Sequence, residues 1–275
     1  MRIAWTTDPH FDHADVDAWQ SWFEENAAIG GDGLLITGDL SEGDDVSLQL
    51  LRLANSFNLP IYFVLGNHDF YQRSIAETRQ QIISLCRQKE RLFYLTDCGP
   101  IRLADHVYLV GDDGWGDATV GNYEQSPIKL RDFENINDFL FTDPSEWKTR
   151  LQREGAESAE RLRKKLEATP LDAKQVLIAT HIPPFSEACW YEGRTTDEYW
   201  APFFVCGSVG KMLVDFCPTR PDCYWNVLCG HTHHDGVANI RSNLTVHTGG
   251  SIYGKPQIEA VIEVSSAKVV LRSIN

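Results

Sequence analysis

The sequence lacks any long apolar run and any recognisable targeting segment. No stretch reaches the roughly 18 consecutive apolar residues that a transmembrane helix requires. Near the N-terminus, Asp8, His10 and Asp12 interrupt the chain where a secretory signal would carry its apolar core. We therefore predict no membrane span and expect a cytoplasmic protein.

Paired cysteines are also missing. The chain has seven cysteines, an odd number, and none of them lie in a C-x-x-C pair. Because disulfides are rare in reducing compartments, we expect free thiols and neither a disulfide framework nor a zinc framework.

Basic residues are few. The chain has 25 lysines and arginines against 39 aspartates and glutamates, for a net charge of −14. The densest basic cluster, residues 161–165, lies among glutamates on a predicted helix, where we expect a solvated face. Such a chain repels polyanions except where bound metals reverse the local field. Long nucleic acid is thus disfavoured as a partner.

Nothing in the sequence divides the chain into separate domains. No repeat, low-complexity tract or linker rich in Pro, Gly and Ser interrupts the 275 residues, and 43% of them are hydrophobic. That fraction is typical of a globular protein with a full core. Because the motifs described next span most of the length, we expect one domain over residues 1–275.

Five short apolar runs are present, and each ends in residues that can bind a metal. The runs and their endings are 2–7 before Asp8-Pro9-His10, 34–37 before Gly38-Asp39, 61–65 before Gly66-Asn67-His68-Asp69, 175–180 before His181, and 225–229 before Gly230-His231-Thr232-His233. Such runs predict buried strands, and ligands gather beyond the carboxyl ends of strands in α/β sheets. Carboxylate, amide and imidazole groups together suit divalent metals.

The remaining periodicity predicts helices between the early strands and further strands near the end. Helices are expected over 14–28, 45–57, 72–89 and 145–168, with Asp44 or Asp45 as the N-cap of the second. Strands are expected over 244–247, 258–264 and 268–271, with residues 265–267 forming a hairpin connection. Two packed mixed sheets flanked by helices would accommodate both halves.

The motifs carry a resemblance to a known family. Asp8-X-His10, Gly38-Asp39, Gly66-Asn67-His68-Asp69, His181 and Gly230-His231-X-His233 resemble, in order and spacing, the five motifs of the calcineurin-like metallophosphoesterase superfamily. The resemblance implies a four-layer α/β/β/α sandwich of two mixed β-sheets flanked by helices. It also implies two divalent metal ions (Mn, Fe, Zn or Ni) and a phosphoesterase activity.

The resemblance further implies a role for each motif residue. It places Asp8, His10, Asp39 and His233 on one metal, and Asp39, Asn67, His181 and His231 on the other, with Asp39 bridging. A bridging hydroxide would attack phosphorus. His68 would donate a proton to the leaving group. Asp69 could orient or charge that imidazole, or cap the helix predicted at 72–89.

Several residues outside the motifs remain open. His247 could line the same sheet edge, whereas we expect His13, His106 and His234 to lie on the surface or outside the metal ligands. Asp112, Asp113 and Trp115 could rim the pocket or form an acidic loop over it. The aromatic-rich insertion at about 183–225 could be a lid or base-stacking pocket, or else local core or an oligomer contact.

We therefore predict a metal-dependent phosphoesterase that hydrolyses a small phosphomonoester or phosphodiester. A nuclease or a protein phosphatase of the same superfamily is the alternative. Protein phosphatases carry an arginine soon after the GD motif, whereas the first arginine after Asp39 is Arg52. A binding module on a phosphoesterase scaffold is a second alternative, against which the full ligand set and His68 argue.

Overall fold

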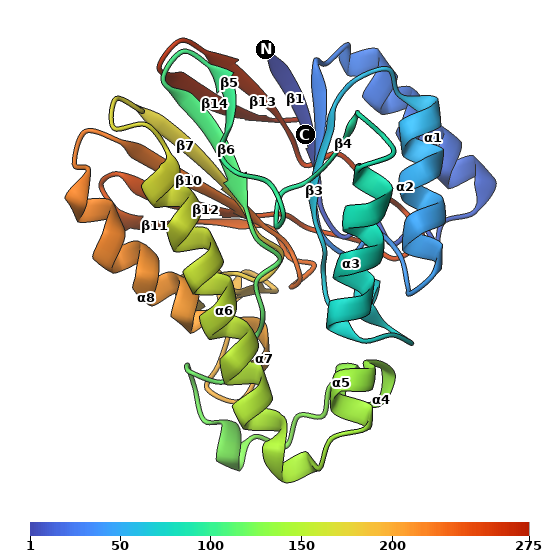
Figure 1. Ribbon diagram of the computed structural model, residues 1–275, viewed down its shortest axis with the longest axis vertical. Helices are drawn as coiled ribbons and strands as arrows, with labels where there is room; N and C mark the ends of the chain where they lie inside the picture. The colour runs from blue at the N-terminus through green and yellow to red at the C-terminus, as the bar shows by residue number, and fades with distance from the viewer. Residues whose placement is uncertain (275) are drawn as a thin grey trace.

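Two six-stranded sheets pack face to face and carry helices on their outer faces (Figure 1). The structure is a computed structural model and describes residues 1–274. The first sheet has the order β14-β13-β1-β2-β3-β4, with bounds β1 (Arg2–Thr6), β2 (Gly33–Thr37), β3 (Ile61–Val64), β4 (Leu92–Tyr94), β13 (Ala260–Ser265) and β14 (Lys268–Ser273). Strands β1 to β4 are parallel, and β13 is antiparallel to both β1 and β14.

The second sheet is also mixed. Its order is β11-β12-β10-β7-β6-β5, with bounds β5 (Ile101–Ala104), β6 (Val107–Gly111), β7 (Gln175–Ala179), β10 (Tyr224–Cys229), β11 (Gly236–Arg241) and β12 (Leu244–Thr248). The four central strands are parallel, and the two edge strands are antiparallel. A separate two-stranded hairpin consists of β8 (Trp190–Tyr191) and β9 (Arg194–Thr195).

The helices complete the four layers. The first sheet is covered by α1 (Val16–Ile29), α2 (Asp45–Ser56) and α3 (Ile75–Cys86), and the second by α6 (Trp147–Ala168) and α8 (Gly207–Phe216) (Figure 1). Short helices α4 (Asp132–Asn135), α5 (Asn137–Leu140) and α7 (Ala201–Phe204) lie at one end of the sandwich, at the bottom of Figure 1. The predicted α/β/β/α architecture is confirmed.

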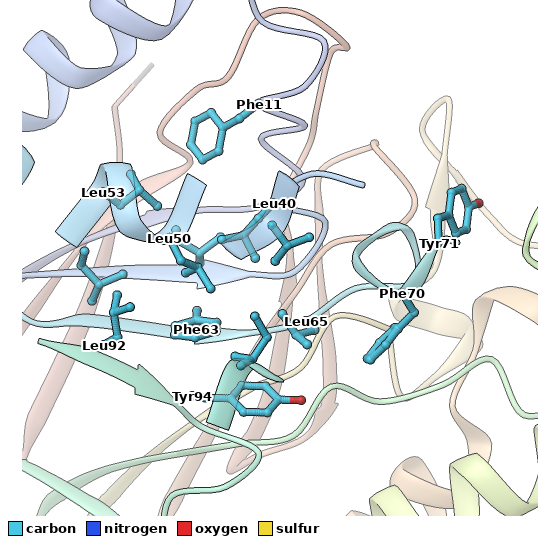
Figure 2. Packing of buried hydrophobic residues seen from close by; sticks show 14 of the residues in the cluster. Phe11, Leu40, Leu50, Leu53, Phe63, Leu65, Phe70, Tyr71, Leu92 and Tyr94 are labelled. Carbon is cyan, nitrogen blue, oxygen red and sulfur yellow. The ribbon is translucent and has the colours of Figure 1, made fainter. Parts of the chain in front are cut away.

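Period-two alternation along the strands builds the layers. In β1, Ile3 and Trp5 face the core between the sheets, whereas Ala4 faces the helices. On the helical side, Figure 2 shows Leu50 and Leu53 of α2 between the helix and the sheet, close to Phe63. Each such fully buried side chain stabilises the fold by about 1.5–3 kcal/mol relative to exposure.

The start of α3 corrects one expectation. The helix predicted over 72–89 begins at Ile75, and Ser74 and Glu77 form a capping box at its N-terminus. Asp69 instead lies within a separate 3-10 turn, η1 (His68–Phe70). The interpretation of Asp69 as the helix cap was therefore wrong. At α2, Asp44 occupies the N-cap position, but its side chain makes no capping hydrogen bond.

Asp112 and Asp113 are buried, so neither forms a loop over the pocket or its rim. Asp113 accepts hydrogen bonds from the Leu65 N–H and the Tyr94 hydroxyl, and its carboxylate lies 3.0 Å from Nε of Arg79. Trp115 is buried in the core beside α5. For the two aspartates both alternatives drawn from the sequence were wrong, because their carboxylates are satisfied by partners inside the sandwich. Trp115 also lines a small cavity with Asn67 and His231, as the pocket alternative held.

The basic cluster on α6 is only half solvated. Lys164 is exposed as predicted and Arg163 is half-exposed, but Nε of Arg161 lies 2.8 Å from the buried carboxylate of Asp112. Lys165 donates from Nζ to three backbone carbonyl oxygens, those of Leu95, Thr96 and Gly111. Arg161 and Lys165 are four residues apart and share one helix face, which turns inward toward partners from distant parts of the chain.

The structure also bears on the cysteines and on membrane-spanning helices within residues 1–274. All seven cysteines are free thiols, as expected. No helix in this part of the chain combines the length and the apolar character needed to cross a membrane.

The segment 183–225 divides into two parts. Its later portion includes α8, whose Val209, Met212 and Leu213 pack into the core of the second sheet. Its earlier portion, with the β8–β9 hairpin and α7, lies at the end of the sandwich and exposes Tyr191 and Trp200. The later portion is therefore local core, as one alternative held, whereas the earlier portion keeps aromatic side chains exposed.

Candidate metal centre

Loops at the carboxyl ends of β1, β2, β3, β7 and β10 bring the seven predicted metal-ligating residues together. Ligand atoms within 4.8 Å of one another form two groups, Asp8, His10, Asp39 and His233 in the first, and Asp39, His181 and His231 in the second. Oδ1 of Asn67 joins the second group, 3.2 Å from Nε2 of His181. These are the two groups that the resemblance implies, and Asp39 belongs to both.

The backbone at five of these residues adopts an unusual conformation. Asp8, His10, Asp39, His231 and His233 have positive φ angles of 44°, 41°, 50°, 70° and 58°. Residues other than glycine rarely adopt positive φ angles, and the resulting backbone strain is found mostly at functional sites. The local cost is offset by the surrounding sandwich, which holds the loops in the turns that point these side chains inward.

The motif glycines allow the side chains to approach so closely. A Cβ atom at Gly66 would lie 2.1 Å from Oδ1 of Asp39, and one at Gly230 would lie 2.0 Å from Oδ2 of Asp8. The glycines that precede the ligands are thus required by contact between loops that are distant in sequence.

Hydrogen bonds orient the second group. Nδ1 of His181 lies 2.9 Å from the carbonyl oxygen of Thr37, which leaves Nε2 facing Asp39 at 3.4 Å. Asn67 donates from Nδ2 to Oδ1 of the buried Asp132 at 2.9 Å, and this contact turns its amide oxygen toward His181. Asp132 comes from α4, so the end of the sandwich helps to position a candidate ligand.

The electrostatics of the centre favour a bound cation. Nδ1 of His10 and Nε2 of His231 are buried without a hydrogen-bond partner among the described residues. Burial lowers the pKa of His10 to about 4 and that of His231 to about 3, so both rings are neutral near pH 7 and can ligate. Burial also opposes charge on His181, but Asp39 and Asp8 outweigh it and raise its pKa to about 10. The two carboxylates therefore attract positive charge, and the donor set fits divalent metals.

His68 lies beside the centre and is held by a residue other than the one expected. Its Nδ1 is 3.4 Å from Oε1 of Glu42, and its ring stacks on Tyr71 with centroids 4.5 Å apart. Asp69 accepts from the backbone N–H groups of Ser41 and Gly66. Asp69 thus supports the loops under the centre, and the carboxylate that contacts the imidazole is Glu42.

A cavity of about 640 Å³, called the metal cavity below, opens over both groups. Its lining comprises His13, Asp39, Glu42, Asn67, His68, Tyr71, Leu130, Arg131, Asp132, Tyr191, Phe204, His231, Thr232, His233, His234 and Tyr253. His13 and His234 line this cavity but belong to neither of the two ligand groups, which agrees with the expectation that they lie outside the metal ligands. His106 is exposed and pairs with Asp172, as expected for a surface residue. His247 lines a different cavity with Glu259.

Sequence reasoning missed several residues of this wall. Tyr253 packs against His10 with ring centroids 4.4 Å apart, and it also contacts His233. Arg131 contributes a cationic side chain to the wall. These residues occupy loops without periodicity. The available sequence signal was Tyr253 next to Gly254, an aromatic in a loop segment, because binding residues often lie on loops.

Comparison with known proteins agrees with this geometry. Residues 1–235 match the family model described as calcineurin-like phosphoesterase. A phosphopantetheinyl hydrolase from Mycobacterium tuberculosis superposes with a TM-score of 0.64 at 13% identity, covering 93% of this chain and 94% of that one. A dimetal phosphatase from Danio rerio gives 0.63 at 14% identity, covering 99% and 95%. At such identities the likeness concerns the fold. No curated protein matches the sequence significantly.

Proposed function

Because the chain belongs to the calcineurin-like phosphoesterase family, we propose that it is a metal-dependent hydrolase of a small phosphomonoester or phosphodiester. The observation that carries the proposal is the pair of ligand groups sharing Asp39 at the base of the metal cavity. We further propose that residues 1–275 act as one domain, since the loops of both sheets contribute to this centre.

The proposed cofactors are two divalent ions, drawn from Mn, Fe, Zn and Ni. Asp8, His10, Asp39 and His233 would hold one, and Asp39, Asn67, His181 and His231 the other. When bound, the ions would supply Lewis acidity that activates water near neutral pH and offsets charge on the phosphoryl oxygens. The neutral amide at Asn67 keeps the ligand set from cancelling that positive charge.

Side chains around the centre would contact the leaving oxygen and the remaining phosphoryl oxygen of the substrate. His68 would donate a proton to the leaving oxygen, while Glu42 holds its ring through Nδ1. Arg131 on the cavity wall would contact a phosphoryl oxygen that faces away from the centre.

A small substrate fits the charge and the cavity better than a polymer does. The chain carries −14, and a nucleic-acid backbone would lie across an acidic surface without the lysine and arginine contacts that normally supply affinity. The proposed partner is therefore a small phosphoester, and a nuclease or protein phosphatase activity is the less favoured alternative.

The direct test combines metal content with turnover. Protein reloaded separately with each of the four metals should bind about two ions per chain and hydrolyse a chromogenic phosphomonoester or phosphodiester. Asp39→Asn should lose both properties. Asp44→Asn, an exposed carboxylate on the same loop, is the matched control and should keep both. Turnover that needs no metal, or that survives in Asp39→Asn, would contradict the proposal.

A further inference from the structure

A second cavity, called the aromatic cavity below, lies next to the metal cavity. Its volume is about 440 Å³, and its walls include Trp190, Trp200 and Arg194. Tyr191, Phe204 and Thr232 line both cavities, which are therefore contiguous. A ligand held in one would extend directly into the other.

A continuous aromatic surface connects the two cavities. Phe204 packs against His231, a candidate metal ligand, with ring centroids 4.4 Å apart. Trp200 also contacts Phe204, edge-on, with ring centroids 5.4 Å apart and an interplanar angle of 75°. Trp200 is 45% exposed and Tyr191 is 58% exposed. Covering such rings with another flat group removes apolar surface from water and adds a stacking contact.

The backbone presents these rings in fixed positions. Between β8 and β9, Glu192 and Gly193 both have positive φ angles, of 48° and 74°, which is the conformation of a tight two-residue hairpin turn. Oδ1 of Asp197 accepts from the backbone N–H groups of Tyr199 and Trp200, at 2.9 and 3.0 Å. A wall held in this way loses little conformational entropy when a ligand binds.

Polar groups at the edge of the cavity suit a ring that also carries hydrogen-bonding atoms. Arg194 is exposed, and it forms no ion pair within residues 1–274. Thr195 and Asp197 add hydroxyl and carboxylate groups to the same lining. Small-ligand sites combine mostly apolar walls with a few polar groups in this manner.

We propose that the aromatic cavity binds the organic group of the phosphoester substrate, and that this group is a flat aromatic or heteroaromatic ring such as a nucleobase. The inference rests on the proposed function, because the phosphoester is placed over the candidate metal centre. The ring then lies against Trp200 and Tyr191, with Arg194 at its polar edge.

The test uses two substrates that differ at the anomeric carbon, where one carries adenine and the other a hydroxyl group. Adenosine 5′-monophosphate and ribose 5-phosphate share one phosphoester linkage, and their methyl esters supply the matching diester pair. Stacking is worth about 1–3 kcal/mol per base, so the metal-loaded enzyme should favour the base-bearing member about 5- to 150-fold in kcat/KM. Trp200→Ala and Tyr191→Ala should each reduce this preference, mainly through KM. Tyr224→Ala, an exposed aromatic at the start of β10, should leave the ratio unchanged.

Binding measurements separate this inference from the proposed function. Calorimetry with adenosine 5′-monophosphate and ribose 5-phosphate should show the same preference, whether or not either compound is hydrolysed. Preferential binding that Trp200→Ala abolishes would support the aromatic cavity even if no phosphoester turned over. Turnover or binding without preference for the base, or a preference unaffected by both aromatic variants, would overturn the inference while leaving the phosphoesterase proposal intact.

Discussion

Nε2 of His10 and Nε2 of His233 lie 3.1 Å apart, although the two residues are carried by loops of different sheets. Two neutral imidazoles can share one hydrogen there, but Nδ1 of His10 remains buried without a partner among the described residues. A cation that accepts a lone pair from Nε2 of each ring, as metals do from histidine ligands, would account for the short distance between these two atoms.

The first prediction is that removing one ligand from each group lowers metal content stepwise. His10→Ala and His231→Ala should each bind about one ion per chain where the parent binds about two, because each residue belongs to a different group. Elemental analysis after reloading measures this. His247→Ala is the control, since His247 lines another cavity. Full metal content in both ligand variants would rule out the assigned groups.

The second prediction concerns His68. If this residue serves the leaving group, His68→Ala should retain its metals and lose about 10²–10⁴-fold in turnover. The loss should shrink for substrates with good leaving groups, which need little protonation. Glu42→Gln should show a smaller loss of the same kind, because it only holds the ring. An equal loss for good and poor leaving groups would argue against a proton donor.

The third prediction is a preference for small substrates. A mononucleotide-sized phosphoester should be hydrolysed with a higher kcat/KM than single-stranded or duplex DNA, because the acidic surface opposes a polyanion. Steady-state rates at physiological salt provide the comparison. Efficient DNA cleavage under those conditions would favour the nuclease alternative.

The fourth prediction is that Asp113 serves stability and not the reaction. Asp113→Ala removes one of the two buried carboxylates that pair with Arg79, and it also leaves the Leu65 N–H and the Tyr94 hydroxyl without their acceptor. The free energy of unfolding should fall by about 3–5 kcal/mol. Asp97→Ala, at an exposed position, should change it by less than about 0.5 kcal/mol. Urea denaturation measures both. Unchanged stability with reduced activity per folded molecule would restore a role for Asp113 at the pocket.

The fifth prediction concerns pH. Burial raises the pKa of Glu259 from 4.5 to about 7, so the folded state holds a proton that the unfolded state releases between these values. The contribution of this group to stability is complete below pH 4.5 and is lost as the pH rises to about 7. The free energy of unfolding of Glu259→Gln, relative to that of the parent, should therefore rise by on the order of 1–3 kcal/mol between pH 4.5 and pH 8.

Urea denaturation at several pH values tests this difference. Glu263→Gln is a suitable control, because the Glu263 side chain is 39% exposed and pairs with Arg272. A difference between Glu259→Gln and the parent that stays constant with pH would show that the carboxyl group does not titrate as proposed.

Much of the fold is readable from the sequence because strand signals are local. The apolar runs before Asp8, Asp39 and His181 predict β1, β2 and β7 to within a residue or two. The reason is that a buried strand shows itself by the apolar pattern of residues adjacent in the sequence. The parallel order of these strands then places their carboxyl ends together. The seven candidate ligands accordingly converge as expected.

The remaining features depend on partners that are distant in sequence. Asp113 pairs with Arg79, Lys165 with the carbonyl of Gly111, and Asn67 with Asp132, and no local pattern signals any of these contacts. A charged residue looks the same in the sequence whether it lies on the surface or is buried with a partner. Its charge alone therefore could not predict its burial.

What the sequence determined by itself was therefore the strand pattern, the ligand types and their order along the chain. The tertiary structure decided how they are used. It turned five of the ligands inward through positive φ angles, placed Glu42 where Asp69 was expected, and set Trp200 beside the metal cavity. The physical reason is that backbone strain and long-range packing are decided only when the two sheets close upon each other.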